Sequence, residues 1–331
     1  MRRKITIAAS VCVVLLAAVL TVAVRLDAGG FQPVFGEEAA SLLAAVQRGC
    51  EEAKSRVSSS AGTVTVREWH WRSSGELLET ETRYTVASAG DTFRALCETR
   101  YITNQWVSRE SGLPFNPPGT VQRVDMAYDG EKVTKYQPQR GRADMGGPDS
   151  HWERELGSIR RSVLSPGGGV FIPKSVARSE IREPMDPRVI GREIVNGDEC
   201  IVCEVAYTTK LSDGSTGTFY DYMWINPAKG FTLAKEESGA RGGRFGDGML
   251  LSHRELDLRK YGDNLWGLSE VRHGQYGLDD AGKRYPNIRE IITFGKDYRL
   301  NPSVTEDMLT VDLPSGTQVF DEVIDAGYVV P

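Results

Sequence analysis

The chain has 331 residues, of which 40% are hydrophobic and 26% are charged, and its net charge is −5. This is the composition of an ordinary globular protein, and the acidic balance argues against a nucleic-acid partner. Thirty-five glycines suit a β protein with many turns. The length permits two domains, but a large all-β domain of this size commonly forms one unit.

The N-terminal segment is the clearest physical signal. MRRK precedes twenty uncharged, mostly apolar residues at 5–24, and at 1.5 Å per residue they span roughly 30 Å, the thickness of one bilayer core. The basic flank keeps the N-terminus in the cytoplasm. A cleaved signal peptide is the alternative, with a small-x-small pattern at 28–30. Either way we expect the body outside the cytoplasm: anchored on the periplasmic side of the inner membrane, or released into the periplasm.

The predicted organisation is an anchor or signal over 1–25, a spacer over 26–36 and one domain over 37–331. The domain begins with a predicted helix over 37–57, since acids start it, apolar residues recur at helical spacing and basic residues end it. Extended segments follow. In TVTVREWHWR, residues 63–72, side chains alternate across a strand, so Trp69 and Trp71 share one face and His70 lies on the other.

Period-two patterning continues through 76–87 and 91–103, with turn residues between them, and predicts a meander of antiparallel strands. A hairpin is expected around Asp129-Gly130, whereas 104–120 and 137–150 are predicted to be irregular. HWERELGSIRRSVL at 151–164 predicts a second helix.

Strands resume at residue 188, with a turn at Asn196-Gly197. In TFYDYMWIN, residues 218–226, both faces carry apolar or aromatic side chains, so this strand is expected to be covered. About ten strands and one or two helices predict a mainly β fold: a single large, curved antiparallel sheet.

Cysteine, histidine and serine patterns give no sign of catalysis. Cys200 and Cys203 lie three apart in a predicted strand, so they face opposite sides roughly 10 Å apart, too far for a disulfide with each other. Buried thiols, or a pairing with a distant cysteine, remain open. No metal-binding histidine spacing, phosphate loop or serine nucleophile motif is present. We therefore expect no enzyme activity, no cofactor and no metal.

Three stretches resemble the LolA/LolB/RseB-like superfamily. YDYMWINPAKGFTLAKEE at 220–237 resembles its W-I-D-P-x-T-G-L-P strand–turn–strand, and LRKYGDNLWGLSEVR at 258–272 resembles its tyrosine strand followed by W-x-P, with Gly267 and Leu268 where proline is common. EDMLTVDLPSGTQVFD at 306–321 resembles its closing F-T-x-x-x-P-x-G-x-x-V-x-D segment, with Leu309 near the expected phenylalanine. The resemblance covers residues 37–325.

This resemblance implies an unclosed β half-barrel with helices and an apolar cavity on its concave side. It implies binding of a lipid or a lipoprotein acyl chain, as carrier or envelope sensor. The alternative is a regulatory interaction domain with a filled core that binds an envelope protein. A membrane segment at 5–24 and long loops at 104–120 and 137–170 favour a fixed module over a diffusing shuttle. The candidate cavity residues are Trp69, Trp71, Tyr84, Phe93, Tyr220, Tyr222 and Trp224.

Overall fold

The computed structural model describes residues 31–106, 116–147, 187–211, 214–246, 248–279 and 282–331. The predicted anchor or signal segment 5–24 and the predicted helix 151–164 lie outside these residues. Among the described residues, no helix is both long enough and apolar enough to cross a membrane.

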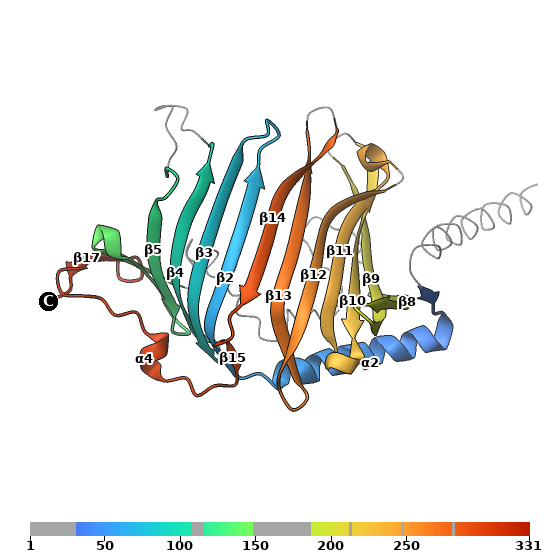
Figure 1. Ribbon diagram of the computed structural model, residues 1–331, viewed down its shortest axis with the longest axis horizontal. Helices are drawn as coiled ribbons and strands as arrows, with labels where there is room; N and C mark the ends of the chain where they lie inside the picture. Colours follow the sequence, from blue (N-terminus) through green and yellow to red (C-terminus); the bar gives the residue numbers. More distant parts are fainter. Residues whose placement is uncertain (1–30, 107–115, 148–186, 212–213, 247, 280–281) are drawn as a thin grey trace, which may run out of the picture.

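Two antiparallel meanders make one sheet (Figure 1). The first contains β2 (Ser59–Trp71), β3 (Leu77–Ala89), β4 (Thr92–Asn104), β5 (Val121–Tyr128), β6 (Val133–Gln137) and β7 (Arg142–Gly146). The second contains β8 (Arg188–Val195), β9 (Asp198–Lys210), β10 (Thr216–Asn226), β11 (Thr232–Arg241), β12 (Met249–Gly262), β13 (Leu265–Leu278) and β14 (Arg284–Phe294). The last strand, β14, pairs with the first, β2, so the two meanders join at the centre of the sheet.

Short strands complete the sheet at its edges. β1 (Gln32–Pro33) pairs with β8, and β16 (Gln318–Asp321) pairs with β7 and with β17 (Ala326–Val329). β15 (Arg299–Leu300) lies along the start of β2. Within the described residues β1 and β17 do not pair with each other, so the sheet is unclosed, as predicted.

The predictions missed some of these short elements. The described residues form seventeen strands rather than about ten, because strands of two to five residues are too short to show a period. Segment 137–150 was expected to be irregular, but it contains β7, which follows a left-handed turn at Gly141. The β7–β16 pair is parallel, whereas every pairing was expected to be antiparallel.

The predicted N-terminal helix is confirmed as α2 (Gly36–Ser55). Glu37 and Glu38 lie in its first turn and Lys54 in its last, which complements the helix dipole. Its buried residues, which include Val46 and Cys50, join the main apolar cluster of the sheet. We call the face that carries this cluster the inner face. In Figure 1, α2 crosses the lower end of the half of the sheet that contains β8–β12. The single-turn helix α4 (Glu306–Leu309) follows β15 in the chain.

The opposite, outer face carries a second and smaller apolar cluster. It contains Phe31, Cys200, Val202, Trp224 and Ala234. Cys203 belongs to the inner cluster, so the two cysteines of the CIVC stretch face opposite sides, as predicted. The four cysteines in the described residues form no disulfide, and all four are buried.

Candidate functional site

The seven predicted cavity residues do not share one face of the sheet. Tyr84 and Phe93 pack in the inner cluster, and Tyr222 and Trp224 pack in the outer cluster. On β2, Val64 and Val66 belong to the inner cluster, so alternation places Trp69 and Trp71 on the outer face. On β10, the same alternation places Tyr220 on the outer face with Tyr222 and Trp224. A single cavity therefore cannot be lined by all seven. Period two shows which side chains share a face, but not which face the helix covers.

The aromatic residues of β10 form a ladder on the outer face. Tyr220, Tyr222 and Trp224 follow each other with ring centroids 5.0 and 6.4 Å apart. Trp224 is 1% exposed, and its indole N–H donates a 2.8 Å hydrogen bond to Glu193. The Lys235 ammonium lies 4.3 Å from the Trp224 ring. Trp224 is thus a core residue with its polar atom satisfied.

The two inner-face aromatics are also core residues. Phe93 is 3% exposed and its ring lies 6.0 Å from that of Tyr128. Burial is the main cause that raises the pKa of Tyr84, and the nearby Cys97 and Glu68 raise it further. The phenol of Tyr84 therefore stays neutral at physiological pH.

Polar and apolar side chains divide the centre of the inner face into two adjacent rows. The polar row runs across five neighbouring strands through successive partners Glu236, Arg254, His273, Glu290 and Glu68. The apolar row lies beside it on β12, β13, β14 and β2, two residues from the polar row on each strand. It consists of Leu256, Val271, Ile292 and Val66. The register thus makes this part of the inner face amphipathic.

The polar row is held by ion pairs yet stays accessible. Arg254 lies 3.3 Å from Glu236, and His273 lies 3.5 Å from Glu290. Their side chains are 14–40% exposed, whereas each residue of the apolar row is 3% exposed. Burial raises the pKa of Glu236, although the charge of Arg254 lowers it. A carboxylate kept in a partly dehydrated position is a feature that marks functional sites.

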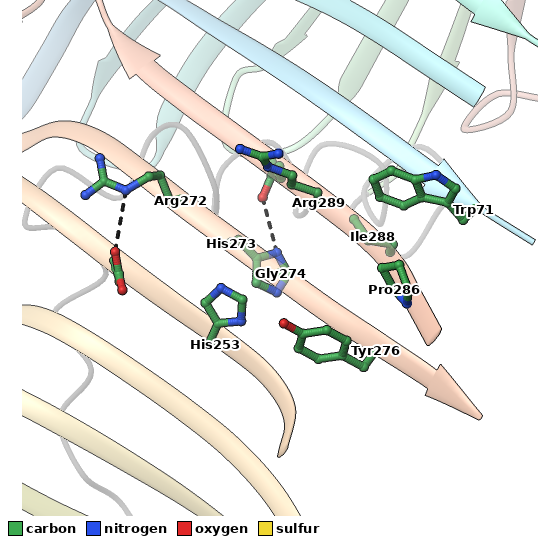
Figure 2. A pocket seen from close by; sticks show the side chains of 11 residues that line it. Trp71, His253, Arg272, His273, Gly274, Tyr276, Pro286, Ile288 and Arg289 are labelled. Atoms are coloured by element: carbon green, nitrogen blue, oxygen red, sulfur yellow. Dashed lines mark ion pairs between the residues drawn. The ribbon is translucent and has the colours of Figure 1, made fainter. Parts of the chain in front are cut away.

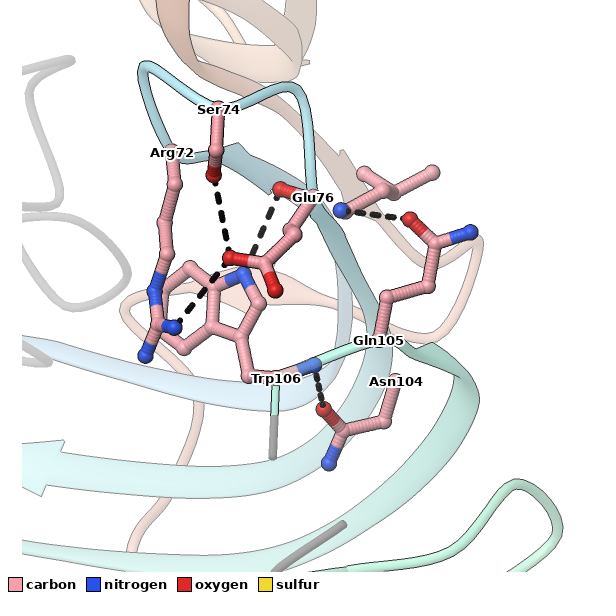
Figure 3. Close-up of polar contacts among 7 residues, drawn as sticks. Arg72, Ser74, Glu76, Asn104, Gln105 and Trp106 are labelled. Carbon is pink, nitrogen blue, oxygen red and sulfur yellow. Dashed lines mark hydrogen bonds and ion pairs between the residues drawn. The ribbon is translucent and has the colours of Figure 1, made fainter. Parts of the chain in front are cut away.

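Trp106 contacts the inner-face residue His70. Sequence reasoning missed it because it lies in a segment predicted to be a loop. Its ring meets His70 edge-on with centroids 6.3 Å apart. Figure 3 shows how the rim around it is fixed. The indole N–H donates to the backbone oxygen of Glu76 at 3.3 Å, the backbone N–H of Trp106 donates to the Asn104 side chain at 3.0 Å, and the Arg72 guanidinium lies 4.8 Å from the ring.

His70 lies on the inner face, opposite its two neighbouring tryptophans, as predicted. It is 3.6 Å from Glu68 and extends the polar row toward Trp106. In the part of the chain that the structure describes, no group of three or more His, Cys, Asp or Glu side chains is arranged to hold a metal ion.

An unclosed sheet with an N-terminal helix packed on its inner face is the architecture that the sequence resemblance implies. No family model matches the chain, and no curated protein matches it in sequence.

Three solved structures illustrate how far similarity to other proteins extends. A DUF1329 family protein from Desulfovibrio piger matches with a TM-score of 0.40 and 11% identity, over 81% of this chain and 97% of that one. A LolA superfamily protein from Nitrosomonas europaea matches with a TM-score of 0.36 and 13% identity, over 81% and 97%. An uncharacterized conserved protein from Thermus thermophilus matches with a TM-score of 0.30 and 12% identity, over 84% and 98%.

Proposed function

We propose that the protein is an extracytoplasmic binding module for an amphipathic lipid or a lipoprotein acyl chain, which it holds on the inner face of the sheet. The observation that supports this most is the adjacency of the polar and apolar rows. An acylated ligand has the same division, with a polar head next to an apolar chain. The accessible polar row suits the head, and the apolar row suits the chain.

The driving force for binding comes from the ligand's own surface. The apolar row is already buried, so an acyl chain binds by replacing protein contacts on this row. An acyl chain that removes roughly 300 Å² of its surface from water gains about 7.5 kcal/mol at about 25 cal/mol per Å². Part of this gain offsets the entropy that the ligand loses on association.

Arg254 provides the test, because it is the one guanidinium in the polar row. We expect the protein to bind a fluorescent fatty acid, and Arg254→Ala to weaken that binding by about tenfold or more, since a charge-assisted hydrogen bond to the carboxylate is lost. Arg123→Ala is the matched control: Arg123, on β5, pairs with Glu98 on β4, away from the row. No binding by the wild-type protein, or equal affinities for all three proteins, would contradict the proposal.

A second function, binding of an envelope protein, is favoured by the C-terminal edge of the sheet. Within the described ranges β17 pairs with β16 alone, and exposed apolar side chains gather on this hairpin. They are Phe320, Val323, Ile324, Tyr328 and Val329, which are 42–60% exposed. An extended segment of a partner could add a strand along such an edge. A photo-crosslinker at Val329 tests this in intact envelopes: it should capture one discrete partner, and labelling that matches the same probe at exposed Lys260 would exclude a specific partner.

A further inference from the structure

A groove on the outer face has no role in the proposed binding of an acyl chain. It crosses β12, β13, β14 and the end of β2 and has a volume of about 430 Å³ (Figure 2). We define the outer groove by four of its lining residues, Trp71, His253, Tyr276 and Arg289. A site of this size is at the lower end of the range for small-ligand pockets, and it fits a head group rather than a whole lipid.

The floor of the outer groove depends on a glycine. His253, Gly274 and Arg289 are successive partners across β12, β13 and β14. The His253 ring lies over Gly274, where a Cβ atom would come within 3.0 Å of His253 Nδ1. It also stacks on Tyr276, with centroids 5.9 Å apart and the planes inclined by 28°. The imidazole is therefore fixed in one orientation.

This imidazole leaves a polar atom unsatisfied. His253 Nδ1 is buried and has no hydrogen-bond partner among the described residues. A buried polar atom without a partner is unfavourable, because it has lost its hydrogen bonds to water. Such a cost disappears if a ligand supplies the missing partner.

Arg289 supplies an uncompensated positive charge at the same place. Its guanidinium lies 5.1 Å from the Trp69 ring, and within the described residues it has no carboxylate partner. Arg67 stacks on the same indole at 5.0 Å, but it is neutralised by Glu79. Arg272, on the opposite wall, is also neutralised, since three carboxylates lie within 3.5 Å of it.

Arg284 adds a second such cation next to the groove. Its guanidinium stacks on Tyr276 at 3.8 Å, and the described residues offer it no carboxylate either. Both guanidinium groups are held on aromatic rings, and neither has an acidic partner among the described residues. Glu255 and Glu290 also line the groove, but Glu255 lies 3.5 Å from Arg272 and Glu290 lies 3.5 Å from His273. Arg289 and Arg284 therefore supply the charge that would attract an anion to the outer groove, and the aromatic rings would cover an apolar moiety.

We propose that the outer groove binds a phosphate group, carried by a soluble phosphomonoester or by a phospholipid head group. The planar fork of Arg289 matches phosphate oxygens and can donate two hydrogen bonds to them. His253 offers a further polar contact at the floor. Trp71 and Tyr276 supply apolar surface for the carbon part of the ligand. His273 and Glu290 of the polar row also line the groove. The groups proposed to hold the phosphate, Arg289 and His253, are not part of that row, so their test does not depend on the proposed acyl-chain function.

Two soluble probes distinguish the sources of the phosphate. The full-length protein in nonionic detergent is titrated with glycerol 3-phosphate, and separately with dihexanoyl phosphatidylglycerol below its critical micelle concentration, while tryptophan fluorescence reports on Trp69 and Trp71. We expect saturable binding of at least one probe, and Arg289→Ala to weaken it by about tenfold or more. Preference for the first probe identifies a soluble phosphomonoester, and preference for the second identifies a lipid head group.

Control variants distinguish specific binding in the outer groove from a general effect of the protein's positive charges on anion binding. Arg289 is exposed, so its replacement should leave the fold intact, which circular dichroism verifies. Arg289→Lys keeps the charge without the fork and should fall between wild type and Arg289→Ala. Arg123→Ala removes a charge from a distant part of the sheet and should bind like wild type. Failure of both probes to bind, or equal binding by wild type and Arg289→Ala, would overturn the proposal.

Discussion

The ring of Phe231 lies against the Cα atom of Gly49, so this turn of α2 has no room for a side chain. The Cys50 thiol donates to the backbone oxygen of Phe231 at 3.4 Å, which fixes the same contact. Phe231 has a φ of 61°, a left-handed conformation that is rare for an aromatic residue. The packing against α2 maintains this strained turn, and so joins the helix to the β10–β11 connection.

Gly49→Ala should therefore destabilise the protein. Alanine is favoured over glycine in a helix by about 1 kcal/mol, but overpacking against Phe231 costs about 1–3 kcal/mol. We expect a net loss in the free energy of unfolding of up to about 2 kcal/mol, measured by urea denaturation. In the Phe231→Ala background the same substitution should become stabilising, because only the helix preference remains. Stabilisation by Gly49→Ala in the wild-type background would show that the contact is not tight.

Asp198 should make stability depend on pH in the acid range. Hydrogen bonds from Lys229, at 2.8 Å, and from Asn226, at 3.0 Å, lower the pKa of this carboxyl below its ordinary value of 3.8. A lowered pKa means that the contribution is fully present above about pH 5 and is lost as the pH falls through and below 3.8.

Urea unfolding of wild type and Asp198→Asn between pH 7 and pH 3 measures this effect. The stability difference between the two proteins should be largest at neutral pH and should shrink as the pH falls toward 3. A difference that stays constant over this range would mean that the ionised form of Asp198 contributes nothing. Because Asp198 is 29% exposed, solvent screening keeps the effect modest.

Glu236→Gln should show the opposite dependence. Burial raises the pKa of Glu236 above its ordinary value of 4.5, so the ionised form is disfavoured in the folded protein. The folded state then loses stability as the pH rises from 4.5 through the raised pKa, and the amide does not. We expect Glu236→Gln to be more stable than wild type at pH 8 and closer to it at pH 4, measured by thermal unfolding. A loss of stability at pH 8 would indicate that the pairing with Arg254 outweighs the burial.

The four cysteines of the folded domain should be unreactive. Burial raises the pKa of Cys50, Cys200 and Cys203 to about 12, so almost no thiolate is present at pH 8. Alkylation with iodoacetamide followed by peptide mass spectrometry should find Cys50, Cys97, Cys200 and Cys203 labelled only in denaturant. Rapid labelling of Cys200 or Cys203 under native conditions would contradict the burial and would reopen a redox role for CIVC.

Sequence patterns predicted the large elements of this fold because a long helix or strand repeats its periodic spacing of apolar residues many times. α2 has twenty residues, which is more than five helical turns, and β3 and β4 each have thirteen residues of alternation. The turn at Asn196-Gly197 was predictable since both residues adopt positive φ, which their side chains tolerate. By contrast β7 and β16 contain four or five residues each, and their parallel pairing joins segments that are far apart in the chain.

The candidate site was less predictable than the fold. The aromatic residues on β2 and β10 are conspicuous in the sequence, yet most of them lie on the face opposite the main core. The polar row consists of residues from five strands that come together only through register, so no local motif contains it. Alternation alone could have shown that His70 and Glu68 share a face with Val66, which was the one local sign of an amphipathic inner face.

Native mass spectrometry tests the central claim, that the inner face holds an acylated ligand, most directly. The protein would be purified from a bacterial envelope without detergent, as residues 26–331. We predict a discrete added mass that organic solvent removes and that lipid analysis identifies. A single mass equal to that of the polypeptide, unchanged after incubation with fatty acids and phospholipids, would contradict the claim, and the exposed C-terminal edge at β17 would then become the leading functional surface.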